Sequence, residues 1–164
     1  MKSVVKIFSV ALLAVCCLMP STLLGQTKAN FAGTWAFNEA KSVMPEGNGP
    51  RMMSQKMVVT QDANALQVVR TSERGDATQK FTLDGKESVN PVFGEITSKS
   101  TVAFSADGKT MTITTKMEFE MEGQKTEFTT KEAWVLTAPA ALSVTTSFTT
   151  PNGDMKLTSV YDKK

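Results

Sequence analysis

Apolar and polar residues alternate along most of this chain, with the two-residue period that a half-buried β-strand produces. The clearest segment is residues 110–121, where one parity is apolar and the other carries threonine, lysine and glutamate. The large apolar members are Met111, Ile113, Met117 and Phe119. We therefore predict a strand with one side towards a core and the other towards water.

Residues 124–136 show the same alternation, and the Glu-Gly pair at 122–123 separates the two segments. A glycine at this position supplies the backbone freedom that a tight turn requires. Phe128, Glu132 and Trp134 share the apolar parity of the second segment. The two segments together predict a long β-hairpin.

The same test predicts nine strands, joined mostly by short turns that contain glycine. The candidate strands are residues 33–38, 53–61, 66–71, 78–83, 99–105, 110–121, 124–136, 141–149 and 155–161. Residues 39–51 and 85–95 break the rhythm with proline and glycine, so we predict loops there. The first of these loops is a candidate lid for one end of the domain.

About eight or nine antiparallel strands in chain order make an up-and-down meander, and the fold class is all-β. The edges of such a sheet have to be hidden, and closure into a barrel achieves this directly. A β-sandwich is the alternative architecture.

The N-terminus has the pattern of a secretory signal. Lys2 and Lys6 precede an uncharged apolar run at residues 7–19, which is 13 residues long and shorter than the roughly 20 that a membrane helix needs. A cut after Gly25 or after Ala29 fits the small residues there. We predict a signal peptide at 1–25, a single domain at 26–164 and an exported protein, periplasmic or secreted.

Cys16 and Cys17 are the two cysteines of the chain, and both lie inside the apolar run. Val15 precedes the first, where a lipoprotein signal has a small residue, so the sequence does not favour a lipid anchor. Removing 25 of 164 residues leaves 139, with 16 basic and 16 acidic residues, no cysteine and no histidine. A neutral chain without a basic run does not indicate nucleic acid as a partner.

The missing residue types exclude several chemistries for the predicted mature chain. Nucleophilic sites that use histidine or cysteine are excluded, as are zinc and copper sites with imidazole or thiolate ligands. We predict no cofactor, no metal site and no transmembrane segment after cleavage of the signal. Glu118 and Glu120 lie on the polar side of their strand, which indicates a solvated outer surface.

Two charged residues share an apolar parity. Glu132 lies on the side of Phe128 and Trp134, and Arg70 follows Leu66 in the predicted strand 66–71. A buried carboxylate needs a partner, and an arginine inside the barrel supplies one. Arg70 and Glu132 are therefore candidate polar anchors for a ligand; a structural ion pair is the alternative.

The opening residues 30–38 read Asn-Phe-Ala-Gly-Thr-Trp-Ala-Phe-Asn, and residues 83–86 read Leu-Asp-Gly-Lys. A Gly-x-Trp at the start of the first strand resembles the opening motif of lipocalins and related calycin barrels, here of the secreted bacterial kind. The resemblance implies that Trp35 plugs the closed end of a barrel and that a basic residue from the last strands packs over it. Lys156 is the nearest match for that residue.

The best hypothesis is a non-catalytic, lipocalin-like barrel that binds a small hydrophobic ligand in its interior. Methionine-rich inner faces suit such a pocket, and they equally suit an ordinary core. The candidate lining residues are Trp35, Phe37, Met57, Met111, Ile113, Met117, Phe119, Phe128, Trp134 and Phe148. The alternatives are an interaction module with a solid core that contacts another envelope protein and, less favoured, a carboxylate enzyme. A cavity of roughly 300 Å³ or more would distinguish the first from the second.

Overall fold

The computed structural model describes residues 27–44, 53–73, 75–121, 124–150 and 153–164. All regular structure in these residues is β, with ten strands and no helix. The strands are β1 (Gly33–Val43), β2 (Lys56–Gln61), β3 (Ala65–Ser72), β4 (Gly75–Thr82), β5 (Ser88–Phe93), β6 (Ile96–Phe104), β7 (Thr110–Met121), β8 (Gln124–Ala138), β9 (Ala141–Thr150) and β10 (Gly153–Lys163). The predicted signal peptide, residues 1–25, lies outside the described residues.

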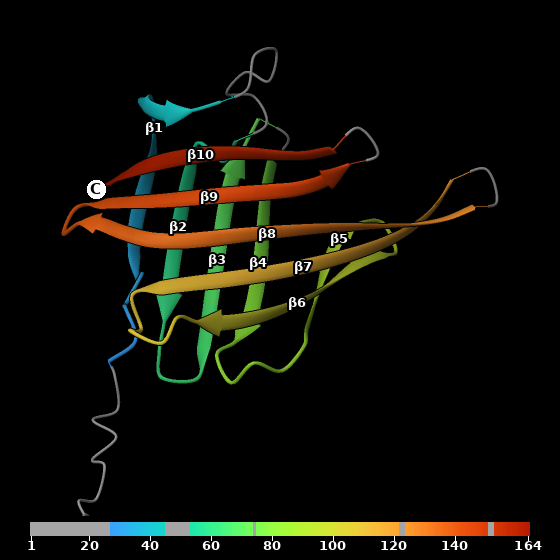
Figure 1. Ribbon diagram of the computed structural model, residues 1–164, viewed down its shortest axis with the longest axis horizontal. Coiled ribbons are helices and arrows are strands. Elements are labelled where there is room, and N and C mark those ends of the chain that lie inside the picture. Colours follow the sequence, from blue (N-terminus) through green and yellow to red (C-terminus); the bar gives the residue numbers. More distant parts are fainter. Residues whose placement is uncertain (1–26, 45–52, 74, 122–123, 151–152) are drawn as a thin grey trace, which may run out of the picture.

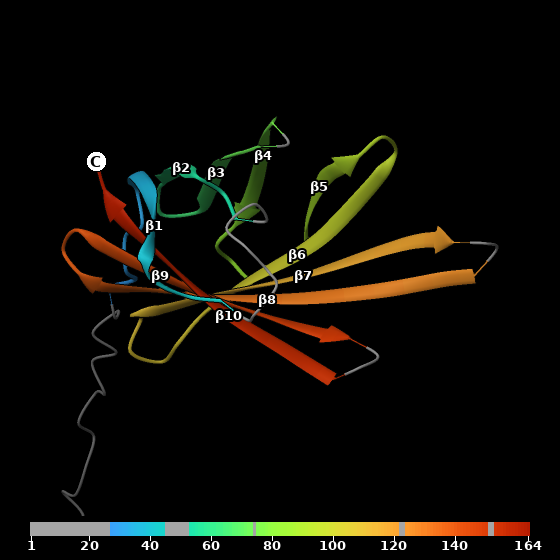
Figure 2. The same ribbon diagram turned by 90° about the horizontal axis from the view of Figure 1, so that it is seen from above.

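The ten strands form one antiparallel sheet in the order β4-β3-β2-β1-β10-β9-β8-β7-β6-β5. Strands that follow each other in the chain are neighbours in the sheet, except for β4 and β5, which lie at its two ends. The first and last strands, β1 and β10, are paired in the middle of the sheet. Strands β1–β4 cross behind β6–β10, and the two layers face each other when seen from above (Figures 1 and 2). The predicted all-β barrel is confirmed, nearly closed and with ten strands.

The additional strand is β5, in the region 85–95 that the sequence predicted as a loop. That prediction is wrong for residues 88–93, which pair with β6 in the register Val89↔Lys99 and Pro91↔Thr97. Proline lacks an N–H group, so it is tolerated on an edge strand, and β5 is an edge of the sheet.

Side chains bridge the place where β4 and β5 lie next to each other without a backbone ladder. The Lys80 N–H donates to Asn90 Oδ1 at 2.7 Å, and Asn90 Nδ2 donates to the Lys80 carbonyl at 3.0 Å. The Thr82 N–H donates to Ser88 Oγ at 3.0 Å. Asn90 is buried, and its amide takes the place of a peptide group. Side-chain hydrogen bonds therefore connect the two edge strands at this point, and the barrel is nearly closed.

The predicted loop at 39–51 also begins later than expected, because β1 continues to Val43 through an irregularity after Asn38. Ser42 Oγ donates to the Asn38 carbonyl at 2.7 Å and accepts the Val160 N–H at 2.9 Å. These bonds replace the ladder where the register shifts. The prediction of a loop is wrong for residues 39–43, and residues 45–51 lie outside the described residues.

One end of the barrel is closed by residues 27–32, which run across it before β1. The Ala29 N–H donates to the Gly108 carbonyl at 2.9 Å. Gln61 binds this segment on both sides, since Nε2 donates to the Ala29 carbonyl and Oε1 accepts the Phe31 N–H. Gly108 has a φ of +68°, and a Cβ there would lie 3.0 Å from a backbone oxygen of the segment. Glycine thus permits both the turn and the close approach.

Trp35 fills this closed end, as the resemblance implied: it is 1% exposed, and its Nε1 donates to the Phe31 carbonyl at 2.9 Å. The basic residue over its ring is Lys163, with Nζ 5.5 Å from the ring centroid, and not Lys156 as predicted. The reason is the register of β1 with β10, which sets Lys163 directly opposite Trp35. A Cβ on Gly33 would lie 2.8 Å from Lys163 Cε, so the Gly-x-Trp glycine leaves room for this lysine.

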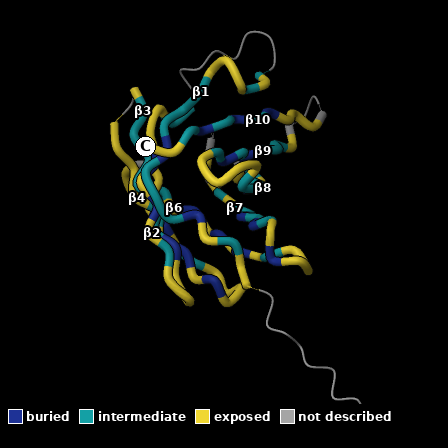
Figure 3. Tube along the Cα trace, turned by 90° about the vertical axis from the view of Figure 1, so that its left-hand side faces the viewer, coloured by how far each residue is buried: buried dark blue, intermediate teal, exposed yellow. Residues whose placement is uncertain are grey.

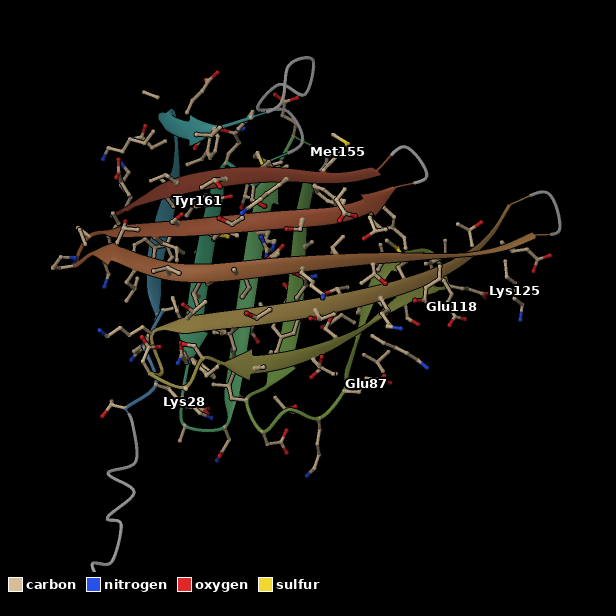
Figure 4. All side chains as sticks on the ribbon, viewed as in Figure 1. Lys28, Glu87, Glu118, Lys125, Met155 and Tyr161 are labelled. Atoms are coloured by element: carbon tan, nitrogen blue, oxygen red, sulfur yellow. The ribbon has the colours of Figure 1, made fainter. Side chains whose placement is uncertain are left out.

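The buried residues that form the core come from strands of both layers (Figure 3). The ring of Phe31 meets that of Trp134 edge-on at 5.9 Å, which links the N-terminal segment to β8. On the outside, Glu118 and Glu120 are exposed, as predicted from their parity. Glu118 and Lys125 lie on the part of the β7–β8 hairpin that projects beyond the barrel (Figure 4).

Candidate functional site

The half of the barrel opposite the closed end holds a cavity of about 550 Å³. It is lined by β3 and β4 on one side and by β8, β9 and β10 on the other. Its lining residues are Met44, Met53, Ser54, Arg70, Ala77, Gln79, Phe128, Glu132, Val144, Thr146, Phe148, Met155, Lys156, Leu157, Ser159 and Tyr161. Met155 is 37% exposed, so solvent reaches the cavity at the β9–β10 end. The volume lies within the range of about 300–1,000 Å³ of small-molecule sites.

Apolar side chains supply most of the wall. Phe128 on β8 and Phe148 on β9 stack with centroids 6.0 Å apart and ring planes at 29°. Val144 and Leu157 are buried beside them. Their inward direction follows from the two-residue period of each strand, since the same parity carries the core residues further along. The wall therefore suits the apolar body of a ligand.

An ion pair crosses the barrel where the cavity meets the core. Arg70 Nη2 donates to Glu132 Oε2 at 2.7 Å, and the two side chains are 17% and 23% exposed. Arg70 lies on β3 and Glu132 on β8, two strands that are not neighbours in the sheet. Each shares its parity with buried residues, which is why both point inward. Each charge stabilises the other in this mostly buried position, because an unpaired charge here would carry an uncompensated free energy of desolvation.

Further contacts hold both members of the pair. Glu132 Oε2 also accepts Trp134 Nε1 at 2.9 Å. Arg70 Nε donates to Gln79 Oε1 at 3.0 Å, and its Nη1 lies 3.5 Å from Met57 Sδ. The guanidinium stands 5.5 Å from the centroid of the Trp134 ring. These contacts fix the orientation of the pair before any ligand arrives.

The pair keeps hydrogen-bonding capacity on its cavity side. No hydrogen bond from a described residue reaches Glu132 Oε1. In the described part of the chain every fully buried polar side-chain atom has a partner, so Oε1 is open to the cavity. A guanidinium carries five N–H groups, and Arg70 uses three of them. The pair thus offers both an acceptor and donors to a ligand.

Tyr161 on β10 lies in the same wall and is 3% exposed. Burial raises the pKa of its hydroxyl to about 12, and the nearby positive charge of Arg70 opposes part of that rise. The phenol is therefore neutral at physiological pH. Its ring meets that of Phe37 at 5.7 Å, and Ser159 Oγ, two residues away, donates to Met53 Sδ at 3.0 Å.

The residues singled out from the sequence fall into two groups. Arg70, Glu132, Phe128 and Phe148 line the cavity. The larger group does not line the cavity. Inward parity shows that a residue faces the interior of the barrel, but it does not show whether the residue lies in the filled half or in the open half. Trp35, Met57, Met111, Ile113 and Trp134 are packed in the core, Phe37 packs against it, Met117 is half-buried outside the cavity wall, and the Phe119 side chain lies outside the described residues.

Several wall residues were not among the sequence candidates. Tyr161 shares a parity with Leu157, which was a usable signal. Gln79 lies in β4, whose pattern is irregular, and Met53 precedes β2 in a connecting segment. Both have an inward parity, Gln79 with Phe81 and Met53 with Met57 in the predicted strand 53–61. Parity alone did not show that they face the cavity, because that depends on the closure of the sheet.

The described residues contain no cluster of three or more acidic, histidine or cysteine side chains suited to a metal ion. Among those same residues, no helix has the length and apolar character to cross a membrane.

No family model matches the sequence, and no curated protein matches it. Solved structures do match. One is the crystal structure of zebrafish ileal bile acid-binding protein in complex with cholic acid, with a TM-score of 0.54 and 15% sequence identity. The alignment covers 82% of this chain and 98% of that chain. At this identity the likeness shows the fold alone, in agreement with the antiparallel barrel described above.

Proposed function

We propose that this protein binds a small hydrophobic molecule inside its barrel, without catalysis, and that it acts after export to the periplasm or beyond. The observation that carries the proposal is the cavity of about 550 Å³ with an apolar wall and an oriented ion pair at its inner boundary. Binding sites for small molecules combine an apolar wall with a few placed polar groups in this way.

The cavity also bears on the alternative of an interaction module with a solid core. A barrel that serves only as a scaffold is expected to fill its interior at close packing. Here the closed half is filled around Trp35 and Trp134, whereas the other half is open. The similarity in fold to a barrel whose structure holds cholic acid supports the ligand-binding function in the same direction.

The wall gives less support to a carboxylate enzyme. Acid–base chemistry with carboxylates generally requires two groups that converge on one substrate. The cavity wall, as far as the structure describes it, has one carboxylate, Glu132, and Arg70 already neutralises it.

A neutral hydrophobic fluorophore, N-phenyl-naphthylamine, tests the ligand-binding function on the purified protein. We expect saturable uptake of about one dye per chain, with a blue shift of the emission, because the bound dye leaves water for a mostly apolar wall. Thr146→Trp places an indole in the cavity and should reduce the affinity at least tenfold. Thr149→Trp is the matched control, since Thr149 lies on the same strand with the opposite parity and is exposed.

Absence of dye uptake by the unmodified protein would contradict the proposed function. Equal losses in the two tryptophan variants would place the dye outside the barrel and would contradict it as well.

A further inference from the structure

The polar end of the cavity is electrically balanced before a ligand enters. Arg70 and Glu132 contribute one positive and one negative charge within 2.7 Å of each other. The other charged residue of the wall is Lys156, which is exposed and lies on the opposite parity from Leu157 and Tyr161. The inner part of the described wall therefore carries no net charge.

We infer that the natural ligand bears an uncharged polar group with both a donor and an acceptor, such as a hydroxyl or a primary amide, which binds the Arg70–Glu132 pair. Its donor would reach Glu132 Oε1, the oxygen that no described side chain occupies, and its acceptor would take a free N–H of Arg70. The inference rests on the proposed function and specifies the class of ligand.

An anionic group fits this end of the cavity less well. To reach Arg70 it would lie beside the Glu132 carboxylate, and like charges repel more strongly at a mostly buried site than in open water. Displacing Glu132 does not help, because Trp134 Nε1 also holds Oε2 at 2.9 Å. A displaced carboxylate would in addition lose its counter-charge while it stays half-buried.

A cationic group is repelled in the same way, by the positive charge of Arg70. An ammonium that approaches Glu132 Oε1 would lie close to the Arg70 guanidinium, whose position is fixed by Gln79 and by the ring of Trp134. A neutral hydroxyl is repelled by neither charge, and it satisfies the two open hydrogen-bonding directions at once.

Three ligands with the same alkyl chain and different head groups test the inference: decanol, decanoate and decylamine. Each is used at neutral pH to displace N-phenyl-naphthylamine from the unmodified protein. We expect decanol to bind at least about tenfold more tightly than either charged ligand. A tenfold difference in affinity corresponds to about 1.4 kcal/mol of binding free energy, which one repulsive charge contact can supply. Decanoate that binds as tightly as decanol would overturn the inference.

A charge-removing variant provides a second, independent readout. Glu132→Gln keeps the shape of the side chain and an oxygen for Trp134, and it leaves Arg70 without its counter-charge. We expect the affinity for decanoate to rise about tenfold or more, with that for decanol changed far less. Glu127→Gln is the control, because Glu127 is an exposed carboxylate on the same strand, paired with Lys116 at 3.1 Å.

The outcomes separate the two proposals. Dye uptake with a preference for decanoate overturns the inference and leaves the proposed function intact. Equal gains for decanoate in the Glu132 and Glu127 variants also overturn the inference. Failure of both the dye and all three ligands to bind overturns the proposed function, and the inference with it. The ligand series on the unmodified protein decides the matter even if Glu132→Gln does not fold.

Discussion

Burial governs the ionisation of Tyr161, the single tyrosine of the chain. The side chain lies between the cavity and the ring of Phe37, and desolvation raises its pKa from 10.0 to about 12. Arg70 lowers that pKa somewhat, and Glu132 raises it. At the residue scale, the cavity wall thus combines a neutral tyrosine hydroxyl with an ion pair whose two charges cancel.

This shift predicts a loss of stability at high pH. Above about pH 10 the unfolded chain releases the tyrosine proton, whereas the folded protein keeps it until about pH 12. The unfolded state then binds fewer protons, so the free energy of unfolding falls as pH rises through this interval and is unaffected below it. The contribution should reach roughly 1–2 kcal/mol near pH 11.

Urea unfolding of the unmodified protein and of Tyr161→Phe, at about pH 8 and about pH 11, measures this contribution. The variant removes the titrating hydroxyl, so its stability should fall less between the two pH values. Every other titrating group is present in both proteins and affects them alike. Identical losses would contradict the prediction, as would a tyrosinate absorbance that titrates near pH 10 in the folded protein.

At the scale of elements, the weak point of the barrel is the boundary between β4 and β5. No ladder joins these two edge strands, and the Asn90 amide exchanges two hydrogen bonds with the backbone of Lys80 instead. The arrangement joins the two edges around Lys80 and Asn90, and an unpaired edge is where a sheet is prone to pair with another chain. The sequence showed β5 only as a proline-containing break, because a strand at an edge needs little of the usual pattern.

We expect Asn90→Ala to destabilise the protein by about 1–3 kcal/mol, since it leaves two part-buried backbone groups of Lys80 without their partners. Chemical unfolding measures the loss, and hydrogen exchange should be faster at the Lys80 amide. Asn64→Ala is the control, because Asn64 is exposed in the β2–β3 turn. Unchanged stability together with unchanged exchange at Lys80 would show that the bridge does not hold the strands together.

At the scale of the whole molecule, one end of the barrel is sealed and the other holds the cavity. Residues 27–32 seal the first end through Gln61 and Gly108, directly after the predicted signal. A cut after Gly25 leaves this segment complete, whereas a cut after Ala29 removes part of it. The structural role of the segment therefore favours the earlier of the two proposed cleavage sites.

Expression of the full chain in a Gram-negative host tests the proposed export. Mass spectrometry of the periplasmic product should show the loss of residues 1–25. Replacing Leu12 and Leu13 by arginine interrupts the apolar run and should leave the protein uncleaved in the cytoplasm. Recovery of the uncut chain from the periplasm would contradict the proposal.

The same mass distinguishes the anchored alternative. A lipoprotein would retain Cys16 or Cys17 as its modified first residue, so it would be heavier than the product cut after Gly25 by the lipid and by the residues from that cysteine to Gly25. Because both cysteines lie before Gly25, we expect neither in the mature protein.

What the sequence determined by itself is local. Alternation with a period of two placed nine of the ten strands, and glycines marked most of the turns between them, because both features depend on residues that are close in the chain. Parity also brought Arg70 and Glu132 to the inside. The absence of histidine, and of cysteine after residue 17, excluded whole classes of chemistry without any coordinates.

Only the tertiary structure decided which of the inward residues form the core and which form the cavity. Glu132 and Trp134 share one face of β8, yet Glu132 lines the open half while Trp134 is buried in the filled half. The register of β1 with β10 likewise set Lys163, and not Lys156, over Trp35. These outcomes depend on how distant strands meet when the sheet closes and on how completely their side chains fill the space between, and a local pattern carries neither.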